Sequence, residues 1–244
     1  MDTEDKRQHR LLVLNYIDNL FLRHKFFLQK IIECCTELRK VWNTLNNDDK
    51  NPINHYFDAY LNTYQSLKDS LEIAFNRKID WADFDEIPYS KFMKNCRNAS
   101  THDGFSIINL AVDGKFYISS DITRVSHGKL VLIETPTEEI SLVCIKFSQG
   151  LFLKIKSWFE IEASSLPMYS IEDYLRSFNT DNIKIGMPEE VQQIIKSHKN
   201  QMKEMIEKNR ENLIAQKIKR REDSMESVLS LCNEHLMHVT ATIY

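Results

Sequence analysis

Three side chains of one short polar segment, Arg97-Asn98-Ala99-Ser100-Thr101-His102, could together hold a phosphate and move a proton. Arg97 offers a planar fork of donors that matches phosphate oxygens, and Asn98 adds a side-chain amide next to it. An imidazole can accept or give a proton near neutral pH, and His102 supplies one. The segment therefore predicts phosphate binding coupled to general acid–base chemistry, with Arg97, Asn98 and His102 as candidate catalytic residues.

Two lysines extend this positive charge along the same predicted helix, which starts near Pro88 and stops at Asp103-Gly104. Lys91 and Lys94 precede Arg97 at intervals of three residues, so they form one cationic row on the helix. We interpret the row as a candidate substrate-binding track for phosphate groups. A solvated lysine face explains the same spacing equally well.

Helix geometry sets a condition on this site. Residues five positions apart on an α-helix differ by about 140° in direction, so Arg97 and His102 do not share a face. Either the helix unwinds near Ser100, or two chains meet so that two copies of each side chain line one cleft. The spacing alone leaves both solutions open.

The pattern R-N-x-x-x-H and its surroundings resemble the HEPN superfamily over about residues 7–163. Asn98 directly follows Arg97, the motif falls on the third of four predicted helices, and a glycine stop follows His102. The resemblance implies a four-helix bundle that dimerises with its motif helices about a twofold axis. It also implies a metal-independent endoribonuclease that needs no cofactor.

In the chemistry that this resemblance suggests, His102 exchanges a proton with a ribose 2′-hydroxyl or with the leaving 5′-oxygen. Arg97 stabilises the charge of the transition state, and Asn98 orients Arg97 or the phosphate. The resemblance further implies a toxin, stress or phage-defence setting, with a possible regulatory or antitoxin protein as partner. HEPN toxins paired with a nucleotidyltransferase antitoxin carry a tyrosine where this chain has Gly104, so control by tyrosine modification is not expected.

Two other functions fit the sequence. The chain could be a non-catalytic HEPN-like module that binds RNA or a nucleotide. It could also be a helical interaction scaffold that works through its long C-terminal helix.

Hydrophobic periodicity predicts a mainly α fold in two parts. Helices are expected at about 7–45, 52–75, 88–103 and 135–163, and the last should begin with a capping box of Thr135 and Glu138. The second and fourth helices carry apolar stripes that are expected to be buried: Ile53, Tyr56, Phe57, Tyr60, Leu61, Tyr64, Leu67, Leu71 and Phe75 in the second, and Ile140, Val143, Cys144, Phe147, Leu151, Ile155, Trp158 and Phe159 in the fourth. A β-hairpin at about 114–134 would pair residues 115–119 with 129–133, and together these elements form the bundle of residues 1–163. Residues 164–244 are expected to form a helical C-terminal extension. It would hold a short helix near 171–178 and a long helix from Pro188, with a separate terminal helix starting at Asp223-Ser224.

Composition limits the classes of protein. The 244 residues are 42% hydrophobic and 27% charged, as in soluble globular proteins, and the formal charge of −3 gives no general attraction to nucleic acid. The five cysteines show no paired C-x-x-C spacing and indicate reduced thiols. No apolar run approaches the length of a membrane span, so we expect a cytoplasmic protein without a membrane partner.

Three weaker candidates remain. His127 is expected at the surface of the hairpin turn, and Cys232, His235 and His238 are expected to lie on a helix face, not around a metal. The basic cluster Lys217, Lys219, Arg220 and Arg221 could bind RNA or a partner, but Glu222 and Asp223 beside it favour an ordinary charged face.

Overall fold

The computed structural model describes residues 3–41, 44, 51–168, 170, 173 and 188–241, and most of them are helical. The long helices are α1 (Glu4–Lys40), α2 (Asn51–Phe75), α4 (Ile140–Ile161) and α6 (Glu189–Ala241). The shorter elements are α3 (Ser90–Asp103), the 3₁₀ turns η3 (Trp81–Phe84) and η4 (Ala163–Ser165), and the strands β1 (Leu110–Val112), β2 (Lys115–Tyr117), β3 (Ile122–Ser126) and β4 (Lys129–Ile133). The prediction of a mainly α protein is confirmed.

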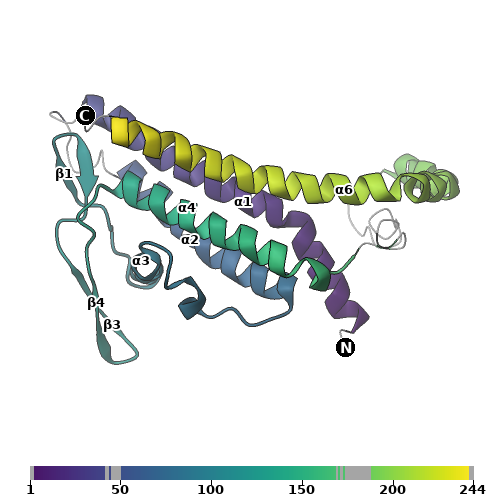
Figure 1. Ribbon diagram of the computed structural model, residues 1–244, viewed down its shortest axis with the longest axis horizontal. Coiled ribbons are helices and arrows are strands. Elements are labelled where there is room, and N and C mark those ends of the chain that lie inside the picture. Colours follow the sequence, from purple (N-terminus) through teal and green to yellow (C-terminus); the bar gives the residue numbers. More distant parts are fainter. Residues whose placement is uncertain are drawn as a thin grey trace.

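The long helices lie roughly side by side, and α3 packs on one side of them. α1 packs along α2, α6 lies against both α1 and α4, and α3 rests on α2. Figure 1 shows α6 and α3 on opposite sides of the bundle, with the strands gathered at one end. The N-terminal part of α6 reaches past the other end of the bundle (Figure 1).

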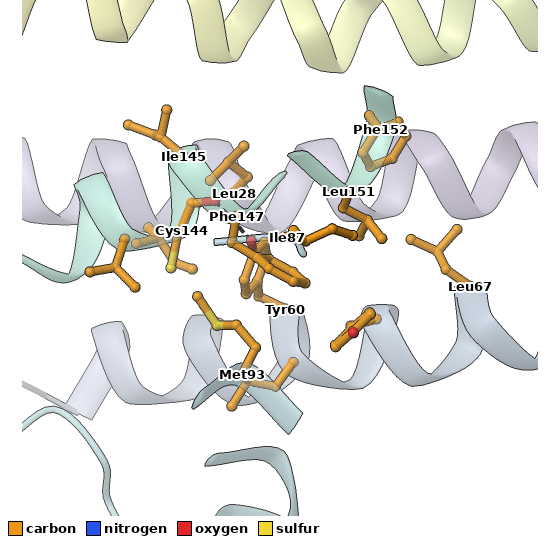
Figure 2. Close-up of a cluster of buried hydrophobic side chains, with 14 of the residues drawn as sticks. Leu28, Tyr60, Leu67, Ile87, Met93, Cys144, Ile145, Phe147, Leu151 and Phe152 are labelled. Atoms are coloured by element: carbon orange, nitrogen blue, oxygen red, sulfur yellow. Dashed lines mark hydrogen bonds between the residues drawn. The ribbon is translucent and has the colours of Figure 1, made fainter. Parts of the chain in front are cut away.

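The core forms where the apolar stripes of α1, α2 and α4 meet. Figure 2 shows Tyr60 of α2 close to Phe147 of α4, with Met93 of α3 on the far side of Tyr60 from α4. The rings of Phe147 and Tyr64 meet edge to face at 4.8 Å between centroids, a geometry that aromatic pairs favour. Every residue of the apolar stripes predicted for α2 and α4 is buried, except the half-buried Tyr56.

The terminal helix is continuous where the sequence predicted a break, so the helix start expected at Asp223-Ser224 is wrong. Ser224 lies inside α6 and its hydroxyl donates to the Arg220 carbonyl one turn back instead of capping a new helix. Past this point α6 buries apolar side chains against α1 and α4: Met225, Val228, Leu229 and Cys232. The domain division at residue 163 stays a prediction, because packing does not tell whether residues 1–163 fold alone.

The strands form two hairpins instead of the one expected, so the predicted pairing of 115–119 with 129–133 is wrong. β1 pairs with β2, and β3 pairs with β4, each antiparallel. The turns Asp113-Gly114 and His127-Gly128 have positive φ at both residues, as two-residue hairpin loops of type I′ require. Each turn therefore joins the strands on its two sides.

Helix ends differ from the prediction for identifiable reasons. α3 starts at Ser90 because Tyr89 adopts a left-handed conformation with φ 63°, and α4 starts at Ile140 with Glu139 as its N-cap. The capping box expected from Thr135 and Glu138 is absent: the Glu138 carboxylate instead accepts from the Tyr89 hydroxyl at 2.8 Å and from Lys146 at 2.5 Å. The expected end of the first helix at Leu45 lies outside the described residues, as does nearly all of the helix expected near 171–178.

Within the described residues, none of the helices combines the length and apolar character that crossing a membrane would require.

Candidate functional site

The motif segment occupies the second half of α3, and that helix stays regular to its end. The Gly104 N–H donates to the Ser100 carbonyl and the Phe105 N–H to the Ala99 carbonyl, while Gly104 itself has φ 69°. These bonds close the last turn in the manner of a glycine C-cap. Unwinding near Ser100, one of the two solutions left open by the sequence, therefore does not occur.

Asn98 and His102 project from the face of α3 that points away from the core. The buried face consists of Phe92, Met93, Cys96 and Ala99. Asn98 and His102 are four residues apart, so they point in directions that differ by only about 40°. His102 is exposed, and Asn98 and Arg97 are half-buried.

Arg97 is linked to this outer face through Asn98. Its Nη1 donates to Asn98 Oδ1 at 3.2 Å, which draws the guanidinium towards the side of the helix that also carries His102. Its Nε is buried and finds no hydrogen-bond acceptor among the described residues. A buried donor without an acceptor costs about 1–3 kcal/mol, so the guanidinium retains unused capacity for hydrogen bonding.

A charged pair that the sequence did not reveal stands next to His102. Arg124 of β3 binds Asp103, with Nε 2.5 Å from Oδ2, and this hydrogen bond lowers the pKa of the Asp103 carboxyl. The pair joins the β3–β4 hairpin to the end of α3. No local signal predicts it, because 21 residues separate the two side chains.

The two lysines are only partly available as a phosphate track. Lys94 Nζ lies 5.3 Å from the centre of the Trp81 ring, and Lys91 Nζ lies 3.6 Å from Asp85 Oδ2. Both therefore contact the 81–85 segment. Lys91 also lines a cavity of about 500 Å³ with Asn95 near the start of α3, and Arg97, Asn98 and His102 are not among the residues that line that cavity.

Asp58 of α2 anchors the inner side of the motif helix. The Ser100 hydroxyl donates to Asp58 Oδ1 at 2.6 Å, and burial raises the pKa of the Asp58 carboxyl. A hydroxyl that satisfies a half-buried carboxylate holds α3 at a defined rotation on α2. The motif contains Ser100, but nothing in the sequence identified Asp58 as its partner.

A second polar cluster, also absent from the sequence prediction, lies inside the bundle. His24 is fully buried, its Nδ1 lies 2.7 Å from Thr63 Oγ1, and its Nε2 lies 2.9 Å from Ser148 Oγ. The Tyr60 hydroxyl completes the chain 2.7 Å from Ser148. Burial lowers the pKa of His24 to about 3, so the imidazole is neutral. The sequence could have indicated that His24 is buried, because it lies at helical spacing from the apolar residues Phe21 and Leu28.

His24 and Ser148 are a histidine and a hydroxyl in hydrogen-bond contact, which is also the arrangement of a nucleophile and its base. Both side chains are completely buried, so no substrate reaches them. The cluster joins α1, α2 and α4 by satisfied hydrogen bonds.

The weaker candidates occupy separate places. His127 lies in the β3–β4 turn, Cys232 is buried, His235 is half-buried, and the side chain of His238 is outside the described ones. Groups of three or more metal-ligating side chains are absent from the described residues. In the basic cluster, Lys219 is exposed, while Lys217 and Arg220 contact Asn15 and Asn19 of α1. All five cysteines are free thiols.

In comparisons with known proteins, no family model, curated protein or solved structure matched the chain.

Proposed function

We propose that this protein is a metal-independent endoribonuclease that acts as a homodimer, with Arg97, Asn98 and His102 as its catalytic residues. One observation carries the proposal: the hydrogen bond from Arg97 to Asn98 brings a cation towards the exposed face on which His102 stands. The HEPN-like pattern of the motif supports it independently. Together they supply a phosphate ligand and a proton carrier at one surface.

The reaction follows from these groups. His102 takes the proton of a ribose 2′-hydroxyl, and the 2′-oxygen attacks the adjacent phosphorus. The bond to the 5′-oxygen breaks as that oxygen receives a proton, which leaves a 2′,3′-cyclic phosphate and a 5′-hydroxyl end. Arg97 stabilises the negative charge that builds on the phosphate oxygens.

A homodimer would bring Arg97 and His102 together although they do not share a face of one helix. Arg97 and His102 of one straight helix diverge by about 140°, whereas two α3 helices about a twofold axis would place the Arg97 of one copy beside the His102 of the other. Once protonated, the His102 of that pair can pass its proton to the leaving oxygen.

The setting remains part of the proposal: a cytoplasmic toxin, stress or phage-defence enzyme, with a regulatory or antitoxin protein as possible partner. Lys91 and Lys94 would contact flanking phosphates only after leaving Asp85 and Trp81. We therefore expect Lys91 and Lys94 to contribute less to RNA affinity than Arg97 does.

The direct test is RNA cleavage by the purified full chain with EDTA present. His102→Ala should reduce the rate by about 10² to 10⁴, the usual value of a positioned acid–base group, and RNA binding should survive. Arg97→Ala should weaken both. The matched controls are His127→Asn, which suits the positive φ of that turn, and Arg23→Ala on the exposed side of α1; both should cleave normally.

Product ends and substrate analogues check the chemistry. The products should end in 2′,3′-cyclic phosphate, and RNA with a 2′-deoxy sugar at the scissile position should resist. RNA binding without cleavage in the wild type would favour the non-catalytic module. Absence of both binding and cleavage would favour the interaction scaffold.

A further inference from the structure

A cavity of about 750 Å³ lies between α1, the end of α4 with the turn that follows it, and α6. Its lining includes no residue of α3 or of the hairpins, so it is separate from the motif surface. The size is that of small-molecule sites, which are typically about 300–1,000 Å³. Its apolar wall includes Leu14, Phe159, Leu166, Ile214 and Met225.

The cationic side chains of this cavity already have partners. Lys156 Nζ lies 3.6 Å from Glu226, Lys217 Nζ donates to Asn15 Oδ1 at 2.6 Å, and the Arg221 guanidinium stacks 4.3 Å from the centre of the Phe159 ring. A bound anion would have to compete with these contacts.

Asp18 is a lining residue whose bonding is incomplete within the described part of the chain. It is 4% exposed, and neither of its carboxylate oxygens accepts a hydrogen bond from the described residues. Arg220, which also lines the cavity, forms an ion pair with Oδ2, but the Arg220 side chain is 64% exposed. A buried carboxylate with so few donors is costly, and a ligand that brings donors would recover that free energy.

The charge of the lining also favours a cation. Glu160, Glu222 and Asp223 are lining residues with exposed side chains, and no ion pair of these three carboxylates occurs within the described part of the chain. They would attract a cation to the cavity and repel a carboxylate or phosphate.

We propose that this cavity binds a small organic amine, with its ammonium group on Asp18 and its hydrocarbon part against Phe159 and Leu14. An ammonium has three donors and no acceptor, which matches a carboxylate whose Oδ1 has no donor among the described residues and whose Oδ2 is paired with the exposed Arg220. It would displace the exposed Arg220 from Oδ2 or share the carboxylate with it. The proposal does not depend on ribonuclease activity, so either can fail alone.

Calorimetric titration of the full chain with hexylamine, hexan-1-ol and hexanoate at physiological ionic strength tests this assignment. The three probes have the same hydrocarbon part and differ in their head group. Hexylamine should bind saturably and hexanoate should not, because only the amine complements Asp18. Hexan-1-ol should bind more weakly than hexylamine.

Three variants locate the binding. Asp18→Asn should weaken hexylamine at least tenfold, and Ile214→Trp should abolish binding by filling the cavity without touching the carboxylate. Arg220→Gln removes the competing cation and should tighten binding. Circular dichroism confirms that each variant is folded.

Either of two results would overturn the proposal. One is hexanoate binding as tightly as hexylamine, or no saturable binding below about 10 mM. The other is hexylamine affinity that is the same in the wild type and in both Asp18→Asn and Ile214→Trp.

Discussion

The buried imidazole of His24 makes the stability of this protein depend on pH. Its folded-state pKa of about 3 lies below the usual value of 6.5, because burial disfavours the charged ring. The unfolded chain therefore binds the extra proton between these values, and stability should fall as the pH falls from 6.5 towards 3. The slope from this group approaches about 1.4 kcal/mol per pH unit.

Denaturant unfolding at pH 7.5, 6.5, 5.5 and 4.5 measures this dependence. The comparison variant is His24→Gln, which retains hydrogen-bonding capacity but does not titrate. The difference in unfolding free energy between wild type and variant should shrink as the pH falls, whereas carboxylate titration affects both alike. Parallel pH curves would show that His24 does not remain neutral in the fold.

Asn98 permits a second test at single-residue scale. Asn98→Ala removes the acceptor that holds Arg97 Nη1, so Arg97 should lose its preferred position while its charge remains. We expect a lower cleavage rate at saturating RNA with a smaller change in RNA affinity, measured by single-turnover kinetics. Asn98→Asp keeps the acceptor oxygen and should retain more activity than Asn98→Ala. Cleavage at the wild-type rate in both variants would show that Asn98 has no part in the site.

At the scale of elements, α3 is held in place by neighbours from distant parts of the chain. Asp58 of α2 fixes its inner face through Ser100, and Arg124 of β3 fixes its end through Asp103. Ile87 and Pro88, just before α3, lie against Gly150 of α4. The orientation of the motif thus depends on α2, α4 and a hairpin.

Gly150 allows the close approach between α4 and the segment that leads into α3. A Cβ at this position would lie 3.0 Å from Ile87 Cγ2 and 3.1 Å from Pro88 Cδ. The Ile87 side chain is buried, and the Pro88 ring is rigid. Gly150→Ala should therefore destabilise the protein by about 1–3 kcal/mol despite the better helix propensity of alanine. Thermal unfolding checks this.

The control is Ser157→Ala on the exposed side of α4, where the propensity gain should raise stability slightly. If Gly150→Ala also stabilises, Ile87 and Pro88 move away at little cost, and the close approach is not a constraint.

At the scale of the whole molecule, the C-terminal half of α6 is part of the bundle core. Leu229 is 5% exposed, whereas Met205 on the same helix is 66% exposed. Leu229→Ala should cost about 2–5 kcal/mol in unfolding free energy, and Met205→Ala should cost little. Urea denaturation measures both. Equal, small effects would show that α6 contributes nothing to the bundle.

A chain of residues 1–163 tests the predicted domain division. We expect it to stay α-helical by circular dichroism but to unfold at lower denaturant, because the surfaces of α1 and α4 that α6 covers become exposed. If the shortened chain has lost its helical signal, the division at 163 is wrong and α6 belongs to the same domain.

The proposed homodimer has a test that uses two inactive variants. If the Arg97 of one copy works with the His102 of the other, mixing Arg97→Ala with His102→Ala chains should restore part of the cleavage rate. Each variant alone should remain inactive. Light scattering should show a dimer for the wild type at micromolar concentration. A monomer that still cleaves RNA, or mixtures without activity, would exclude the shared site.

The sequence by itself determined the helical class and the apolar faces of the helices. The spacing of Tyr60, Tyr64 and Phe147 predicted burial correctly, because the period of 3.6 residues leaves only one way to hide such side chains. It also located the candidate motif near the end of a helix, since Gly104 marks that end. These are local properties, readable from neighbouring residues.

Only the tertiary structure decided which distant groups meet. Four contacts join residues far apart in the chain: Asp58 with Ser100, Arg124 with Asp103, His24 with Thr63, and Asp18 with Arg220. The sequence spacing of these residues carries no periodic signal. Helix starts and strand pairing depended on the same long-range choices, as the contacts of Glu138 show. The local pattern of apolar and polar residues determines which secondary structure each segment can form. Packing between segments determines which polar groups bind one another.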